Sequence, residues 1–166
     1  MKLRKVHVKN YKCVEDSGEF SIDNLTCLVG KNESGKTAIL EALYRLNPQD
    51  SSEKFIRDAQ YPRRHLTDYD TLHPNGDAEV ISTVWELEKA QLDELAGALG
   101  EKCLKDARVR ISKGYKNALS WLMDCDESAV MTFLVEKHLK SAEQKTPAKK
   151  ASLQELKEYL DVKTDR

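Results

Sequence analysis

The stretch LVGKNESGKT, residues 28–37, joins an apolar run to two glycines, a lysine and a threonine. Its spacing is G-x-x-x-x-G-K-[ST], the pattern of a phosphate-binding loop, which is filled here by Gly30, Gly35, Lys36 and Thr37. A loop of this kind presents backbone N–H groups and the positive end of a helix dipole to phosphate. The pattern therefore predicts a nucleotide site, provided that a strand precedes the loop and a helix follows it.

Both flanks of this loop have the required character. Before it, residues 25–30 (LTCLVG) are almost continuously apolar, which predicts a central strand buried on both faces. After it, the period becomes that of a helix, which stops at Asn47-Pro48 and has apolar positions at Ile39, Leu40, Leu43 and Leu46. The alternative is a chance match in a surface turn, and the direct succession of strand, loop and helix argues against it.

The residue types within the loop predict separate roles. Gly30 lets the chain leave the strand, and Gly35 lets the backbone come close to the phosphates. Lys36 is expected to reach the β- and γ-phosphates as a point charge, while the Thr37 hydroxyl is expected to be a Mg²⁺ ligand.

Composition and charge narrow the class of protein. The 166 residues suit one domain with a short extension, and 40% apolar with 33% charged residues is an ordinary soluble composition. The net charge of −1 gives no overall attraction to nucleic acid or membrane, so DNA contact would need a local patch. No signal-peptide core or membrane-length apolar run is present. A cytoplasmic protein with reduced thiols is expected, because no C-x-x-C pair occurs among Cys13, Cys27, Cys103 and Cys125.

The first 77 residues contain two further predicted strands and a long polar segment. A first strand, and a second one after a turn, are predicted from the apolar positions Leu3, Val6, Val8, Phe20 and Ile22. Residues 48–77 are polar, contain prolines and show no period, so we predict a long surface excursion. Within it, the aromatic and basic run YPRRH (Tyr61, Arg63, Arg64 and His65) indicates either nucleic-acid contact or, as we favour, a solvated loop.

The second half of the chain alternates strands and helices. Residues 78–87 predict a strand. A helix follows, with apolar positions at Leu92, Leu95 and Leu99, and it is predicted to end at Gly100. Residues 107–123 predict a hairpin with Lys113-Gly114 near its turn. Trp85 and Trp121 fall in these strands and are expected in the core.

The C-terminal segment predicts two helices and a linker. From Glu127 a helix places on one face the residues Met131, Leu134, Val135, His138 and Leu139. We expect this face to be a self-association surface that does not respond to ATP. After the linker KTPAKK, a last short helix opens with the capping box Ser152-x-x-Glu155 and either docks on this domain or leads further on.

The first 47 residues resemble the N-terminus of ABC-type ATPases of the SMC, RecF and OLD (overcoming-lysogenization-defect) group. Those proteins open with a strand ending I-x-N-F/Y-K/R, followed by a G-x-N-x-S-G-K-[ST] loop and a helix reading L-x-E-A-[IL]. The matching residues here are Val8, Asn10, Tyr11, Lys12, the loop from Gly30 to Thr37, and Leu40, Glu41, Ala42 and Leu43. Residues 61–87 also look like OLD-type and related AAA-type ATPases, with less specific matches.

The resemblance implies an α/β P-loop NTPase fold. Residues 1–126 would form the N-terminal lobe of an ABC-type ATPase, with a mixed β-sheet, a phosphate loop and flanking helices, and residues 127–166 a helical extension. ATP and Mg²⁺ are the implied cofactors, with Asn32 near the γ-phosphate and Ser34 within the binding loop.

The expected surroundings of two further residues, Lys12 and Glu33, remain open at this point. The resemblance places Lys12 near the phosphates or the base, and the alternative is a solvated lysine at a strand end. Glu33 departs from the group, which more often has a small residue there. Because a carboxylate repels phosphate, we expect Glu33 to face solvent or a partner subunit.

The group also carries a second half, with a signature motif and a Walker B strand, and this sequence contains no LSGGQ-like stretch. The nearest candidate for Walker B is WLMDCDE, where an apolar run precedes Asp124, Asp126 and Glu127. These acids have two interpretations. They form either a Mg²⁺-linked group at a strand end or the first turn of the next helix, and their order and position favour the second interpretation. The chain thus resembles a first lobe whose catalytic half lies elsewhere, in a longer protein or a separate subunit.

Two functions remain open at this point. The first is an ATP-binding module in DNA processing, repair or phage defence, with a nuclease in the intact protein, DNA as a partner and no membrane. Its ATPase head would pair with a second head, in a homodimer or with a partner. The alternative is a nucleotide-dependent interaction module without hydrolysis of its own. A GTPase is disfavoured because the N-K-x-D element is absent.

Overall fold

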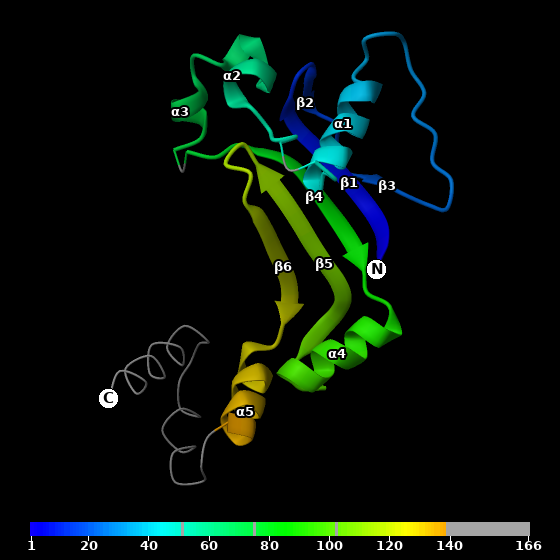
Figure 1. Ribbon diagram of the computed structural model, residues 1–166, viewed down its shortest axis with the longest axis vertical. Coiled ribbons are helices and arrows are strands. Elements are labelled where there is room, and N and C mark those ends of the chain that lie inside the picture. The colour runs from blue at the N-terminus through cyan, green and yellow to red at the C-terminus, as the bar shows by residue number, and fades with distance from the viewer. Residues whose placement is uncertain (51, 75, 102, 139–166) are drawn as a thin grey trace. The chain divides into compact units, whose positions relative to one another are not determined.

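The computed structural model describes residues 1–50, 52–74, 76–101 and 103–138 (Figure 1). The chain divides into two compact units. Unit 1 comprises Met1–Glu86 and Val109–Leu122, and unit 2 comprises Leu87–Arg108 and Met123–Arg166. Two strands, β5 (Leu104–Gly114) and β6 (Leu119–Cys125), each contribute residues to both units. The boundary predicted at residue 126 stays a prediction.

The sheet of unit 1 is organised around its first strand. Strand β1 pairs antiparallel with three others, and the elements are β1 (Lys2–Tyr11), β2 (Val14–Asp16), β3 (Phe20–Ser21) and β4 (Glu79–Glu86). Val6 lies opposite Thr83 and Val8 opposite Ile81, and all four are buried. The strand order is β2-β1-β4-β5-β6, with β3 also on β1. The period-2 alternation of β1 therefore turns Val6 and Val8 to the core, as expected.

Helix α1 (Lys36–Leu46) has the predicted boundaries but a different buried face. Its buried residues are Ala38, Ala42 and Leu46, which are spaced at i, i+4 and i+8 along one side of the helix. Leu40, which we expected on the buried stripe, is 58% exposed. Two small alanines and Leu46 therefore form the buried side of the helix, which packs on β1 and β4.

The polar segment 48–77 is more ordered and more buried than its composition predicts. It forms α2 (Arg57–Gln60), η1 (a 3₁₀-helix, Arg63–His65) and α3 (Tyr69–Leu72). Its three aromatics Phe55, Tyr61 and Tyr69 are each 3% exposed and join an aromatic cluster with Tyr11 and Tyr115 through edge-to-face contacts. The prediction of a surface excursion missed this because isolated aromatics in a polar segment create no period.

Two polar side chains from the hairpin end tie this segment and α1 to the sheet. The Asn117 amide accepts from the N–H of Phe55 at 2.8 Å and donates to the C=O of Phe55 at 2.9 Å. Lys113 is buried, and its ammonium donates to the C=O of Arg45 at 2.8 Å and of Leu46 at 3.4 Å. Because the last carbonyls of a helix have no partner within it, Lys113 caps the C-terminus of α1. Burial, with the nearby charge of Lys54, lowers the pKa of Lys113.

Unit 2 contains two predicted helices, α4 (Lys89–Leu99) and α5 (Glu127–His138), and the end of α4 and the start of α5 lie where predicted. Helix α4 ends at Gly100, whose φ is 103°, and begins with a reciprocal Glu88–Gln91 capping box. In α5, Met131 and Val135 are buried, so the face that we expected to self-associate is used inside the protein. Leu139, the KTPAKK linker and the Ser152–Glu155 capping box lie outside the described residues.

Two predictions about buried apolar residues are wrong. Residues 25–30 form no strand, and Leu25 and Val29 are 86% and 92% exposed. A strand buried on both faces needs a ladder partner, and no described strand pairs with this run, so the expected mixed sheet lacks that central strand. Trp121 lies in β6 as predicted but is 57% exposed, because β6 ends the described sheet. Within the described residues, no helix is long and apolar enough to cross a membrane.

Candidate functional site

The glycine loop is shaped by one glycine that no other residue can replace without strain. Gly35 is buried immediately before α1, and its φ of 91° lies in the left-handed region that favours glycine. A Cβ at this position would lie only 2.7 Å from Cγ2 of Val14 on β2. Both the dihedral angle and the close approach to Val14 therefore require glycine here, while the predicted approach of this backbone to phosphate stays a prediction.

The residues before Gly35 form a tight, exposed turn. The N–H of Ser34 donates to the C=O of Lys31 at 3.3 Å, and a Cβ on Gly30 would lie 2.9 Å from Oγ of Ser34. Glu33 has a φ of 66° and, like Asn32, is exposed to solvent. The loop is thus folded back on itself, with its polar side chains outside.

The Lys36 side chain runs back over this turn. Its ammonium donates to the C=O of Gly30 at 2.8 Å, to the C=O of Lys31 at 2.5 Å and to Oγ of Ser34 at 3.3 Å. The first turn of α1 has no acidic residue, and no side chain caps its N-terminus. A positive charge and a helix end without a side-chain cap therefore lie together, which is an arrangement that attracts an anion.

Thr37 is exposed in the first turn of α1, next to Lys36. Within the described residues no group of three or more His, Cys, Asp or Glu side chains gathers to hold a metal ion. The expected contact of the Thr37 hydroxyl with Mg²⁺ stays a prediction.

Lys12 lies at the sharp turn after β1. Its φ is 53°, and its N–H donates to the C=O of Gln60 at 2.5 Å. Its ammonium forms an ion pair with Glu41, which lies on α1 one turn beyond Thr37 and on the same side of the helix. The hydrogen bond from Lys12 is the main cause that lowers the pKa of the Glu41 carboxyl. The cation is thus directed to the helix side that carries Thr37.

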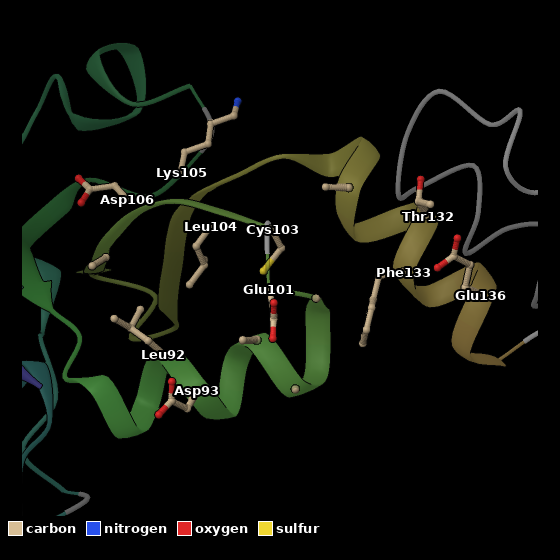
Figure 2. A pocket seen from close by; sticks show the side chains of 15 residues that line it. Leu92, Asp93, Glu101, Cys103, Leu104, Lys105, Asp106, Thr132, Phe133 and Glu136 are labelled. Carbon is tan, nitrogen blue, oxygen red and sulfur yellow. The ribbon is translucent and has the colours of Figure 1, made fainter.

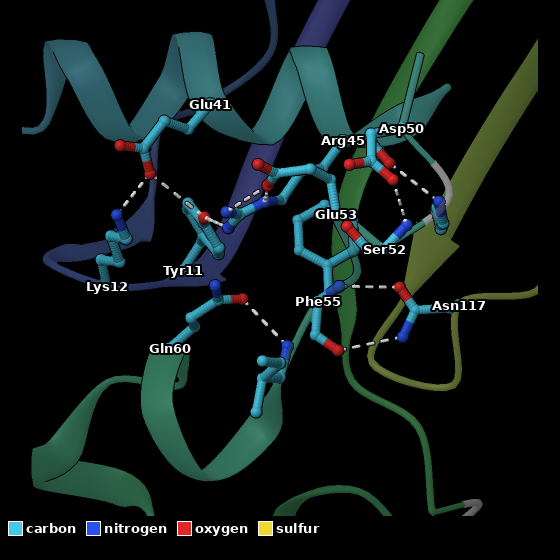
Figure 3. Close-up of polar contacts among 12 residues, drawn as sticks. Tyr11, Lys12, Glu41, Arg45, Asp50, Ser52, Glu53, Phe55, Gln60 and Asn117 are labelled. Atoms are coloured by element: carbon cyan, nitrogen blue, oxygen red, sulfur yellow. Dashed lines mark hydrogen bonds and ion pairs between the residues drawn. The ribbon is translucent and has the colours of Figure 1, made fainter. Parts of the chain in front are cut away.

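A partly buried polar network continues from Glu41 along α1 (Figure 3). The hydroxyl of buried Tyr11 donates to Glu41 at 3.3 Å and accepts from Nη1 of Arg45 at 2.5 Å, and Arg45 pairs with Glu53 at 2.9 Å. Burial raises the pKa of Tyr11 to about 12. The sequence reasoning noted Tyr11 and Glu41 only as family matches. The i, i+4 spacing of Glu41 and Arg45 was the available signal that both face the same neighbour.

The WLMDCDE acids take up structural positions in the described chain. Asp126 accepts from the N–H and the hydroxyl of Ser128, at 3.0 and 2.6 Å, and from the N–H of Ala129 at 3.2 Å. These hydrogen bonds, with that from the Ser128 hydroxyl first, lower the pKa of Asp126. Asp124 is exposed and lies 3.8 Å from Lys105. The arrangement is that of a hairpin strand followed by a helix with an acidic N-cap, the reading that we favoured.

The YPRRH run is divided between core and surface. Tyr61 is buried in the aromatic cluster. Arg64 and His65 are in or near contact with Glu15 of β2, with nitrogen–oxygen distances of 3.2 and 3.7 Å. Glu15 offsets part of the positive charge on which nucleic-acid contact would depend.

Comparison with known proteins extends the match well beyond the loop. A family model for the AAA ATPase domain matches residues 1–165. A search of curated proteins finds no significant match to the chain. The family match therefore covers both compact units and almost the whole sequence, whereas the motifs quoted above cover the first 47 residues.

Proposed function

Because this chain belongs to the AAA ATPase domain family, we propose that it binds Mg-ATP through residues 30–37 at the N-terminus of α1. Membership of the family implies nucleotide binding, and the geometry of the loop supports residues 30–37 as the place where the nucleotide binds. The observation that carries the proposal is the combination at Gly35 and Lys36. Glycine-only geometry holds the backbone against β2, and the lysine ammonium lies over a helix end without a side-chain cap.

Each loop residue has a proposed task in this site. The backbone of Gly30, Asn32, Glu33, Ser34 and Gly35 surrounds the phosphates, and the exposed Glu33 carboxylate stays in solvent. Lys36 exchanges its contacts with loop carbonyls for phosphate oxygens, which are better partners for a cation. When bound, Mg²⁺ neutralises phosphate charge, and the Thr37 hydroxyl is its protein ligand.

Lys12 is proposed as an additional contact to the nucleotide. Its ion pair with Glu41 supports this role, because Glu41 lies one helical turn from Thr37 on the same side of α1. The same ion pair also fits a purely structural lysine. Lys12→Ala distinguishes them, because the structural role predicts a change in thermal stability without a change in ATP affinity.

The test of the main proposal is calorimetry with Mg-ATP on wild type and Lys36→Ala. We expect the variant to bind roughly 10- to 100-fold more weakly, since a charge-assisted hydrogen bond contributes about 1.5–3 kcal/mol. Lys31→Ala is the matched control, because it removes a neighbouring exposed loop lysine at a position where the motif accepts any residue. Equal affinity in wild type and Lys36→Ala would show that the loop does not bind ATP.

We further propose that the intact protein acts in DNA processing, repair or phage defence together with a nuclease, as the resemblance of residues 1–47 to the SMC, RecF and OLD group implies. A second ATPase head, from an identical or a partner subunit, would complete its site. The exposed apolar run of Leu25 and Val29 supports such an incomplete surface. Sedimentation tests this. Any self-association of residues 1–166 should be nearly independent of ATP, whereas the intact protein should associate through its heads in an ATP-dependent way, because ATP shifts association only by its differential affinity.

The alternative, a nucleotide-dependent interaction module, is favoured by one observation. Asp126 caps the N-terminus of α5 and Asp124 lies 3.8 Å from Lys105, so neither of these two acids is presented as a base that activates water. We expect ATP turnover by residues 1–166 to be far below about 1 s⁻¹, the lower end of the usual enzyme range. A rate in that range that Asp124→Ala abolishes would contradict both this alternative and our assignment of Asp124.

A further inference from the structure

The two sides of the described sheet differ in the length and charge of their edge strands. On one side the sheet ends at β2 and β3, which have three and two residues, and β2 carries the acids Glu15 and Asp16. Short, charged edges discourage pairing with another chain. On the other side it ends at β6, whose seven residues, LSWLMDC, include one charge, that of Asp124, and no lysine or proline. This edge thus lacks the short length and the charges that protect the opposite one.

The side chains of β6 form an apolar surface beside its open edge. Leu119, Trp121 and Leu122 are 43%, 57% and 66% exposed, and all three belong to unit 1. Because successive side chains of a strand point to opposite faces, Leu119 and Trp121 share one face and Leu122 lies on the other. Among the described residues no strand pairs beyond β6. An exposed apolar strand with an open backbone edge is a template for pairing with another strand.

A second exposed apolar feature, a cavity of about 1210 Å³ in unit 2, is less suited to a second copy of the chain (Figure 2). Its apolar lining comes from α4, the first residues of β5, and α5. Four acidic residues and one basic residue also line it, and they are Asp93, Glu101, Asp106, Glu136 and Lys105. Two copies that met at this cavity would bring acidic groups together, which opposes association.

The charges that flank β6 favour an antiparallel pair of identical strands. Lys116 precedes the strand and Asp124 lies near its end, both are exposed, and no charged residue stands between them. In an antiparallel pair the start of one strand lies beside the end of the other, so opposite charges approach each other. A parallel pair would instead place the two Asp124 carboxylates side by side, which is destabilising.

We propose that two copies of this chain pair antiparallel along the open edges of their β6 strands, so that the sheet continues from one copy into the other. A register centred on Ser120 places Leu119 opposite Trp121 of the second copy, and the reverse. Aromatic and aliphatic side chains in such cross-strand pairs stabilise antiparallel strands. The same register brings each Asp124 toward Lys116 of the other copy.

Sedimentation of residues 1–166 across a dilution series tests the proposal, and wild type should form a concentration-dependent dimer. Trp121→Lys places a charge near the centre of both paired strands and should weaken dimerisation by about tenfold or more. Leu72→Lys is the matched control, because Leu72 is 53% exposed on α3, and it should dimerise like wild type. Lys36→Ala should also dimerise like wild type, since this inference does not rest on nucleotide binding.

Hydrogen exchange on wild type gives a readout that needs no variant. Amides within residues 119–122 should exchange about tenfold more slowly in concentrated than in dilute protein, because pairing protects the N–H groups of the open edge. This measurement decides the question even where Trp121→Lys folds poorly, which circular dichroism of the variant reveals.

Three results would overturn the proposal. The first is a wild type that stays monomeric at every concentration. The second is equal dimerisation of wild type and a folded Trp121→Lys, which would assign the contact to another surface, such as the cavity of unit 2. The third is a dimer in which the exchange of residues 119–122 does not depend on concentration, because the edge of β6 would then remain open.

Discussion

Residues 25–30 precede α1 in the sequence and residues 48–77 follow it. The two segments differ both in polarity and in how deeply their apolar side chains are buried. The first run is apolar, and its Leu25 and Val29 are almost fully exposed. The second segment is polar, and its Phe55, Tyr61 and Tyr69 are among the most buried residues of unit 1. The difference teaches that a side chain is buried only where its backbone also finds hydrogen-bond partners, because unpaired buried N–H and C=O groups are costly.

The partners of the second segment can be named. Asn117 satisfies both polar groups of the Phe55 backbone, and the N–H of Ala78 donates to the Tyr69 hydroxyl at 2.9 Å. No described strand provides a ladder for residues 25–30. Hydrophobicity alone therefore predicts the wrong segment to be the more buried of the two.

The largest expected effect is at Phe55. Phe55→Ala should lower the free energy of unfolding by about 3–5 kcal/mol, because it removes a buried ring from the aromatic cluster. Urea denaturation followed by circular dichroism measures this. Ile56→Ala is the matched control at the neighbouring, exposed position and should cost far less. Similar losses in both variants would mean that segment 48–77 is not packed as described.

Asn117 should come next. Asn117→Ala leaves the Phe55 N–H and C=O without their side-chain partner and places alanine at a φ of 61°, so we expect a loss of about 2–4 kcal/mol. Asn117→Gly removes the same hydrogen bonds but tolerates the dihedral angle, and should retain roughly 1 kcal/mol more stability. Equal denaturation midpoints for wild type and Asn117→Gly would exclude the amide as the anchor.

A smaller effect is expected from the pKa of Tyr11. Burial raises this pKa from 10.0 to about 12, so the neutral phenol is favoured in the folded protein. The stability that this provides is complete below pH 10 and is lost as the pH rises from about 10 to 12. Tyr11→Phe cannot ionise, and its stability should fall less steeply across that window in pH-dependent thermal melts. Parallel curves for the two proteins would contradict the assignment.

The smallest expected effect is at Val29. Val29→Ser should change the stability of residues 1–166 by no more than about 0.5 kcal/mol, because the side chain is exposed. A loss of stability above about 1 kcal/mol would contradict the exposure of residues 25–30, because it would mean that Val29 is covered in solution. In the intact protein the same variant should weaken ATP-dependent association if the run contacts a second head.

Local patterns predicted much of the secondary structure around the candidate site. The loop, the boundaries of α1, the end of α4, strand β4 and the β5–β6 hairpin all follow from spacing within about a dozen residues. The glycine at position 35 was predictable because the motif encodes a backbone conformation that one residue type adopts easily.

What could not be predicted depends on contacts between distant positions. The Tyr11–Glu41–Arg45 network joins residues about thirty positions apart, and Lys113 reaches α1 from a strand 67 positions away. No periodicity within either segment reports such pairings. Trp121 was misjudged for a related reason: its burial depends on whether another strand follows β6 in the sheet, not on its own residue type.

The capping of α1 by Lys113 provides a way to measure how often α1 separates from the sheet. Lys113 is 8% exposed, and its ammonium holds the end of the helix opposite to the phosphate loop. An amine-reactive reagent in water will therefore label it only when the hairpin separates from α1, while solvent-facing lysines such as Lys31 react at once. The labelling rate of Lys113 reports how often the helix that carries the nucleotide loop comes loose from its sheet.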